Sequence, residues 1–207
     1  MTDKIRVTGV TPYKGSTYKI EFEEGEPYFL NKQTVDMFSL RAGAVLPLSA
    51  WEQITGEEQF RKAKERALYL LDRRDYSYTE LFRKLEQTYP EDICFRVMDK
   101  MVELGTVNDR RYAEGLARHY IEVKRFGLYR AKREMKARGL TGEVIDEALS
   151  AYEDDWYERL YELVKEKYLR YLEDENGERR VTNALVRGGY SFSQVREVLR
   201  DIEDEYE

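Results

Sequence analysis

The side chains best suited to bind another molecule lie between Arg110 and Arg138. This stretch holds ten basic and three acidic residues, although the 207-residue chain has a formal net charge of -6. Lys132 and Lys136 are four residues apart, so a helix would place both ammonium groups on one face. Such a ridge can follow a row of phosphates or an acidic groove on a protein, and interleaved rings can stack on bases. The interleaved aromatic residues are Tyr112, Tyr120, Phe126 and Tyr129.

The same stretch can also be an ordinary solvated helix face that covers core aromatic side chains, and the residues alone favour neither interpretation. Two further basic pairs, Arg73-Arg74 and Arg83-Lys84, flank the segment Ser77–Glu80. The pairs can extend a basic surface, or they can belong to a charged exterior in which cations and carboxylates pair along a helix. The flanked segment has the spacing of a capping box, so a helix is predicted to begin there.

Residues typical of catalysis or metal binding are scarce. His119 is the only histidine and Cys94 the only cysteine, so a histidine-based triad would rest on one residue and no Cys/His cluster has zinc spacing. The sequence has no Walker motif and no glycine-rich dinucleotide loop. Carboxylates are abundant, but no pair stands out at catalytic spacing. Cys94 is predicted to be a small core residue. We therefore expect no enzymatic activity, no catalytic residue, no metal and no cofactor.

The cysteine content and the apolar pattern indicate a compartment. A single cysteine allows no intrachain disulfide, which fits a reducing environment. The first ten residues lack the apolar core of a signal peptide, and no stretch approaches the roughly 18 apolar residues of a membrane span. We expect a cytoplasmic protein that does not contact a membrane.

The elements that would position these residues are mostly helices. Residues 4–30 alternate apolar and polar side chains between glycine-containing turns, which predicts a small antiparallel sheet. Asn31 is placed to cap a short helix over 32–38, and a last short strand is expected in RAGAVLPLS. From Glu57 onward the apolar residues recur at helical spacing to the end of the chain.

The helical part repeats with a period near 50 residues. Leu85, Met135 and Leu185 take the same place in the second helix of three successive units. Such a period predicts tandem repeats that contact mainly their neighbours, in an elongated, curved array. The expected fold is mostly α, with three tandem three-helix repeats and a small antiparallel β segment at the N-terminus. The expected divisions are a β-rich extension at 1–56 and repeats at 57–107, 108–152 and 153–207.

Three segments resemble one known family. RALYLLDRRDYSYTELFRKL (66–85) is similar to the first-repeat signature of the RecX family, an Ala-Leu helix, a basic pair and then Ser-x-x-Glu-Leu-x-x-Lys-Leu. LGTVNDRRYAEGLARHYI (104–121) resembles the phrase that joins the first two repeats, and RFGLYRAKREMKARGL (125–140) resembles the second-repeat stretch. The resemblance covers residues 57–203. Leu128 stands where the family often has proline.

The resemblance implies three tandem three-helix repeats and a role without chemistry of its own. RecX-type proteins bind the filament of RecA on single-stranded DNA and modulate its recombinase, ATPase and co-protease activities, with inhibition the expected direction. This role belongs to homologous recombination, DNA repair and the SOS response. The implied partners are the RecA filament and, directly or through RecA, single-stranded DNA, with this chain as a monomer. The candidate contacts are Arg73, Arg74, Lys84, Arg118, Lys124, Arg125, Arg130, Lys132, Arg133 and Lys136.

The alternative function is a free-standing helical nucleic-acid-binding module. Compact three-helix units also underlie helix-turn-helix readers of DNA. The overall acidity of the chain weighs against this alternative, because nucleic-acid-binding domains tend to be basic.

Overall fold

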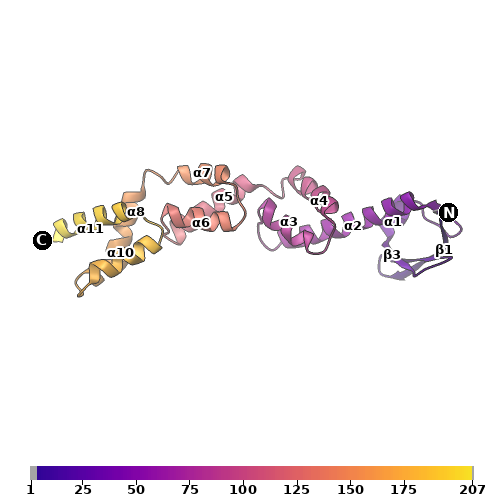
Figure 1. Cartoon of the computed structure of the whole chain (residues 1–207), viewed down its shortest axis with the longest axis horizontal. Helices are drawn as coiled ribbons and strands as arrows, with labels where there is room; N and C mark the ends of the chain where they lie inside the picture. The colour runs from indigo at the N-terminus through magenta and orange to yellow at the C-terminus, as the bar shows by residue number, and fades with distance from the viewer. Residues whose placement is uncertain (1–3, 207) are drawn as a thin grey trace. The chain divides into compact units, whose positions relative to one another are not determined.

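The computed structural model describes residues 4–206 and is mostly helical (Figure 1). A small antiparallel sheet precedes three-helix repeats, so the predicted fold class is confirmed. The chain divides into two compact units. The first unit holds the described residues up to Arg74 together with Phe82–Glu103, and the second holds Asp75–Leu81 together with the described residues from Leu104 onward.

The sheet consists of β1 (Lys4–Lys14), β2 (Thr17–Phe22), β3 (Tyr28–Asn31) and β4 (Val45–Pro47), in the order β3-β2-β1-β4. All neighbouring strands are antiparallel. Inward-facing residues such as Val7 and Ile20 are fully buried in one core, as the two-residue period of a strand requires. Asn31 caps α1 (Lys32–Met37) by accepting a hydrogen bond from the amide of Gln33 at 2.9 Å. The predicted sheet, short helix and last strand are present.

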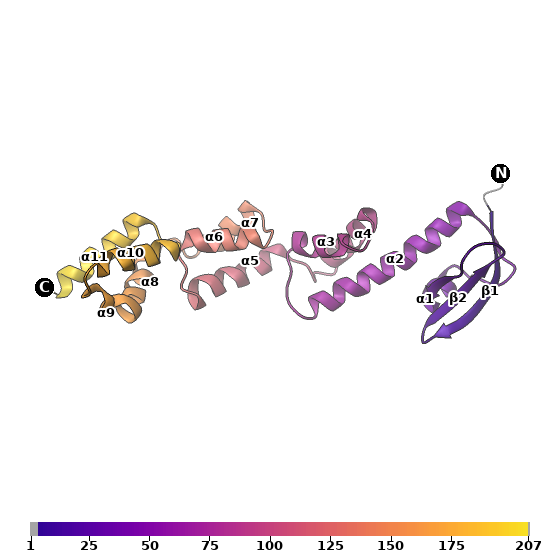
Figure 2. The ribbon, with the colours of Figure 1, turned by 60° about the horizontal axis from the view of Figure 1, so that its bottom comes forward.

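The helix after β4 begins earlier than the sequence pattern predicts. α2 spans Leu48–Leu71, whereas the pattern indicates helix only from Glu57. Gly56 and the β-branched Thr55 lower the helix propensity of this part. Ile54 is nevertheless buried in the sheet core, and this packing stabilises the early turns against their propensity. α2 therefore crosses the expected division between residues 56 and 57, and its N-terminal half lies beside the sheet (Figure 2).

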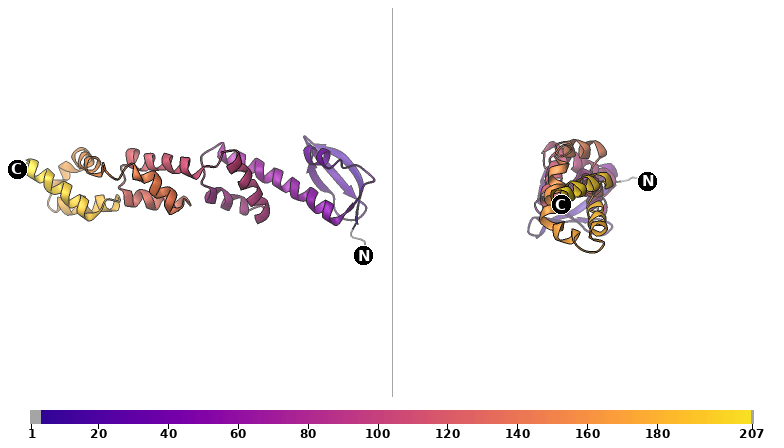
Figure 3. Two further views of the ribbon diagram at one scale, coloured as in Figure 1. Left: turned by 90° about the horizontal axis from the view of Figure 1, so that it is seen from above. Right: turned by 90° about the vertical axis from the view of Figure 1, so that its left-hand side faces the viewer.

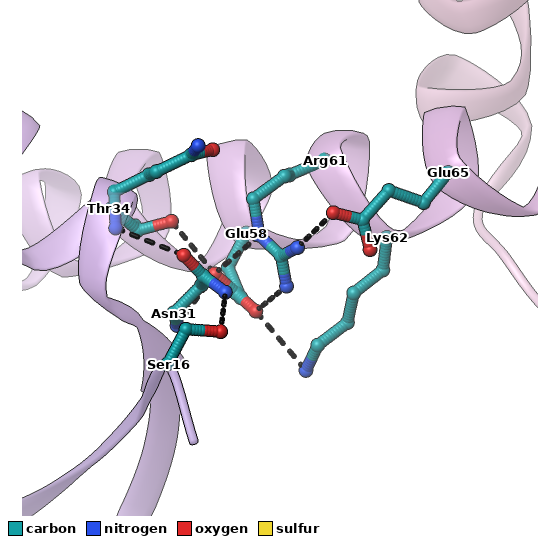
Figure 4. A network of polar contacts seen from close by, with 8 residues as sticks. Ser16, Asn31, Thr34, Glu58, Arg61, Lys62 and Glu65 are labelled. Atoms are coloured by element: carbon teal, nitrogen blue, oxygen red, sulfur yellow. Dashed lines mark hydrogen bonds and ion pairs between the residues drawn. The ribbon is translucent and has the colours of Figure 1, made fainter. Parts of the chain in front are cut away.

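A buried carboxylate ties α2 to the end of the sheet. Glu58 is 1% exposed, and Figure 4 shows it among hydrogen-bond donors. It accepts hydrogen bonds from the amide of Asn31 at 3.1 Å and the hydroxyl of Thr34 at 2.6 Å. It also forms ion pairs with Arg61 at 2.7 Å and Lys62 at 3.4 Å. Burial alone would raise the pKa of Glu58, but hydrogen bonds from Arg61, Thr34 and Asn31 outweigh it and the pKa is lowered.

The remaining helices follow the predicted repeats. In the first repeat, α2 is followed by α3 (Tyr78–Glu86) and α4 (Glu91–Glu103). The second repeat has α5 (Asp109–Arg118), the π-helix η1 (His119–Val123), α6 (Leu128–Ala137) and α7 (Gly142–Ser150). The third has α8 (Trp156–Leu163), the π-helix η2 (Val164–Tyr168), α9 (Leu169–Leu172), α10 (Gly177–Arg187) and α11 (Phe192–Tyr206). Within the second repeat, α5, α6 and α7 contact one another (Figure 3).

A π-helical turn extends the first helix of both the second and the third repeat, where the sequence predicts plain α-helix. In η1 the amide of Lys124 donates to the carbonyl of His119 at 2.9 Å. The wider turn accommodates an extra residue, and the adjacent side chains of Tyr120 and Ile121 are both buried. Burial of two successive large residues depends on tertiary packing, so the helical period in the sequence does not predict the π-helical turn.

Candidate partner interface

The second helix of the second repeat carries the predicted basic ridge. α6 turns Ala131 and Met135 into the core, where both are fully buried, as the sequence predicts. The outward side of the helix therefore presents cations. Arg133 and Lys136 are exposed there. Arg133 lies 4.0 Å from the carboxylate of Glu134, at the outer edge of ion-pair distance, so its charge is only weakly compensated.

Two further candidates are exposed near the end of the first helix of this repeat. Arg118 is the last residue of α5, and Lys124 follows η1 directly. We call the four exposed candidates of the second repeat the exposed basic group; its members are Arg118, Lys124, Arg133 and Lys136.

Three other candidates are held by contacts inside the second unit. Arg125 forms ion pairs with two glutamates of the third repeat, at 3.6 and 3.5 Å. The guanidinium of Arg130 lies over the ring of Phe126, 3.8 Å from its centre. Lys132 forms an ion pair with Asp146 at 2.5 Å. The predicted ridge is therefore interrupted by cations that already have partners within the chain.

The candidates of the first repeat belong to the first unit. Arg73, Arg74 and Lys84 are all exposed. The guanidinium of Arg73 lies 4.5 Å from the ring centre of Tyr69 and donates a hydrogen bond to its hydroxyl. Three of the ten candidates thus belong to the first unit and seven to the second.

Of the four aromatic residues in the basic stretch, three are used within the fold. Tyr120 is buried and Phe126 is half-buried, while the hydroxyl of Tyr112 donates to the carboxylate of Glu80 at 3.4 Å. Tyr129 is 70% exposed, so it is the ring of these four that is best placed to stack on a ligand.

The capping serine of the first repeat also joins this repeat to the second. Ser77 is fully buried; its hydroxyl accepts a hydrogen bond from the amide of Glu80 at 3.1 Å, as the capping box predicts. The same hydroxyl donates to the carbonyl of Arg138 at 2.5 Å, and the Arg138 guanidinium pairs with Glu80 at 3.6 Å. The amide of Tyr78 donates to Asp109 at 2.8 Å. Burial raises the pKa of Asp109, although this hydrogen bond opposes the effect.

The junction between the second and third repeats uses backbone atoms at the same place. The amide of Gly127 donates to the carbonyl of Gly188 at 2.9 Å. A Cβ atom on Gly127 would overlap the carbonyl oxygen of Gly189, so the two chain segments approach at a distance that only glycine permits. Gly127 stands 50 residues after Ser77, and Gly188 stands 50 residues after Arg138. Both junctions therefore use equivalent positions of successive repeats, and we call this arrangement the joint.

This joint does not follow from the helix signals in the sequence. A capping box predicts only a helix start at Ser77, and glycines at 127 and 189 predict only helix ends. The signal that could have revealed the joint is the spacing itself. Ser77 and Gly127 at helix starts, and Gly139 and Gly189 at helix ends, are each separated by 50 residues.

The single histidine and the single cysteine are not brought together with other reactive groups. Cys94 is fully buried, as predicted, and burial raises the pKa of its thiol, which makes it a poor nucleophile. His119 is exposed on η1. Among residues 4–206, no group of three or more His, Cys, Asp or Glu side chains is arranged to hold a metal ion. In the same range no helix combines the length and apolar character needed to cross a membrane.

Family models match two parts of this chain. The model of the RecX first three-helix domain matches residues 63–101, and that of the RecX second three-helix domain matches residues 108–149. The first match contains Ser77, and the second contains Gly127, Arg138 and the exposed basic group.

Relatives and solved structures extend the match to nearly the whole chain. Regulatory protein RecX of Clostridioides difficile is 24% identical over 97% of this chain and 98% of its own length. Regulatory protein RecX of Trichlorobacter lovleyi is 32% identical over 70% of this chain and 99% of its own length. A crystal structure of regulatory protein RecX has a TM-score of 0.72 at 21% identity, over 95% of this chain and 99% of that one. RecX from Lactobacillus salivarius has a TM-score of 0.65 at 22% identity, over 71% and 98% of the two chains.

The two structures establish the likeness of fold, and the relative from T. lovleyi, at more than 30% identity over almost its full length, establishes kinship. This chain belongs to the RecX family.

Proposed function

We propose that this chain regulates the RecA recombinase by binding the RecA filament on single-stranded DNA, and that it inhibits strand exchange, ATP hydrolysis and co-protease action. The observation that carries the proposal is the family membership, since a relative named regulatory protein RecX aligns over 98% of its own length. We further propose that the protein is a cytoplasmic monomer, and that its parts are the extension 1–56 and the repeats 57–107, 108–152 and 153–207.

The exposed basic group supports a contact with a polyanionic filament. Cations that face phosphates release counterions on binding, which favours association at low salt. We propose that the exposed basic group contacts RecA or its DNA, together with Arg73, Arg74 and Lys84. Arg125, Arg130 and Lys132 are candidates on the same grounds; in our proposal their contacts within the second unit keep them from touching the partner.

ATP hydrolysis by RecA on single-stranded DNA tests the proposal, with this protein titrated from sub-stoichiometric to equimolar ratios. We expect the rate to fall. A variant with all four residues of the exposed basic group changed to Gln should need about tenfold more protein for the same inhibition. The reason is that four exposed charges at a few tenths of a kcal/mol each sum to about 1.4 kcal/mol.

A matched control removes four exposed cations from the third repeat and gives the same net charge. The residues changed to Gln in the control are Lys167, Arg179, Arg187 and Arg196. Inhibition kept by the control and weakened in the first variant would support the proposed surface, while equal weakening in both would reject it. If the wild-type protein leaves the ATPase rate unchanged at equimolar ratio, filament regulation is wrong. Salt-sensitive DNA binding without RecA would then favour the nucleic-acid-binding module.

A further inference from the structure

A hollow of about 450 Å³ opens on the surface of the second unit. Its walls come from α6, α7, the segment between α7 and α8, the start of α8, and the first turns of α11. The joint between Gly127 and Gly189 builds it, because the docking of Gly189 fixes where the chain enters α11. The walls therefore come from both repeats, and neither repeat has the hollow by itself.

Part of the lining is apolar and open to a ligand. Leu128, Leu149 and Trp156 line the hollow together with Tyr129, which is 70% exposed. An exposed tyrosine and a half-buried tryptophan offer ring faces, and ring faces attract cations through their quadrupole.

The polar part of the lining leaves negative charge uncompensated. Lys132 is neutralised by Asp146 at 2.5 Å. Ser191 and Gln194 satisfy each other in a capping box at the start of α11, at 2.9 and 3.1 Å. Two more lining carboxylates, Glu153 and Glu197, have no ion pair within 4.0 Å anywhere in residues 4–206. The hollow thus combines ring faces with two carboxylates that form no ion pair within 4.0 Å among the described residues.

We infer that this hollow binds an arginine side chain on the surface of a protein partner. A planar guanidinium can stack on Tyr129 or Trp156 and still donate hydrogen bonds to a carboxylate, whereas a lysine ammonium is a compact, strongly hydrated charge. Nucleic acid does not fit, because three carboxylates against one ammonium in the lining repel phosphates. The inference goes beyond the proposed function: it assigns a protein contact to the junction of the second and third repeats, and its test requires neither RecA nor DNA.

The test uses the indole N–H signals of the two tryptophans in a ¹H–¹⁵N NMR titration of the full chain. The probe is N-acetyl-arginine amide, and the neutral control is N-acetyl-citrulline amide, which keeps the shape without the charge. We expect the Trp156 signal to shift saturably, with half-saturation on the order of millimolar. Trp51 packs against Phe22 and Tyr28 in the first unit, so its signal should stay in place.

Three variants separate recognition from weak general binding. Glu153→Gln with Glu197→Gln should raise the half-saturation concentration about fivefold. Glu178→Gln with Glu203→Gln removes the same charge from exposed positions outside the hollow and should leave it unchanged. Lys132→Gln leaves the Asp146 carboxylate without its cation and should lower the half-saturation concentration.

Either of two results would overturn the inference. One is a citrulline amide titration with the same half-saturation as the arginine amide. The other is a Trp156 signal that responds equally in the Glu153/Glu197 variant and in its control. A protein that binds the arginine amide as expected but leaves RecA unaffected would retain the inference and reject only the proposed function.

Discussion

Glu58 is held by donors from three elements: the amide of Asn31 in β3, the hydroxyl of Thr34 in α1 and the guanidinium of Arg61 in α2. A carboxylate that is 1% exposed persists as an anion only when such donors replace the water that it has lost. Because the donors come from separate elements, the carboxylate fixes the short helix and the sheet edge against α2. The sequence shows a glutamate within a charged helix and gives no sign that this one is buried.

We expect Glu58→Gln to lower the free energy of unfolding of the first unit by about 2 kcal/mol, because it leaves Arg61 without its buried partner. The lowered pKa of Glu58 also sets a pH dependence. The stabilisation is present above the ordinary pKa of an exposed glutamate, about 4.3, and is lost as the pH falls through the lower folded value. Urea unfolding from pH 7 to pH 3, followed by Trp51 fluorescence in a Trp156→Phe background, measures both effects. A variant that loses stability with acid as steeply as the wild type would exclude Glu58 as the titrating group.

Two glycines give opposite predictions for the same substitution. A Cβ on Gly127 meets the backbone of Gly189, whereas a Cβ on Gly115, within α5, meets nothing within 4 Å. Gly127→Ala should therefore destabilise the second unit by about 2 kcal/mol, because the third repeat must move away. Gly115→Ala should stabilise it by roughly 0.5 to 1 kcal/mol, because alanine favours helix. Urea midpoints of the two variants check the signs, and a neutral Gly127→Ala would mean that the repeats are not joined at this point.

For the helices, the sequence predicts those features that follow from a repeating pattern of residues. The 50-residue spacing identifies the repeats, and the inward residues Ala131 and Met135 of α6 follow from the helical period. The early start of α2 and the π-helical turns do not follow, because packing against other elements decides them. The joint between repeats is predictable in part. The sequence indicates that its residues start and end helices, but it does not indicate that they contact one another.

Because of the joint, two serines that cap helices, Ser77 and Ser191, should differ in how much they stabilise the fold. Ser77 caps α3 and also donates to the carbonyl of Arg138, whereas the Ser191 hydroxyl accepts the Gln194 amide at the start of α11. Ser191→Ala should cost about 1 kcal/mol, the usual contribution of a cap. Ser77→Ala should cost roughly 1 kcal/mol more, because a buried carbonyl also loses its donor. Equal losses in urea unfolding of the two variants would show that the bond to Arg138 adds nothing.

The candidate interface could be predicted from the sequence only in part. The basic stretch is visible in the sequence, and the exposed basic group lies within it. The sequence cannot show that Arg125 and Lys132 are paired inside the chain, because their partners come from other helices. It also cannot show the hollow beside α11, whose lining is drawn from residues that are far apart in the chain. The partner itself was indicated by motif resemblance and not by charge.

The two tryptophans lie in different units, so they can report whether the units unfold together. Trp51 packs on the core of the sheet, and Trp156 packs on the core of the third repeat. Repeat proteins gain stability from neighbouring contacts, so a local defect need not spread through the chain. We expect Glu58→Gln to lower the urea midpoint reported by Trp51 in the Trp156→Phe background. The midpoint reported by Trp156 in the Trp51→Phe background should stay unchanged. Gly127→Ala should do the reverse. If both substitutions shift both midpoints by the same amount, the two units unfold together in one cooperative transition.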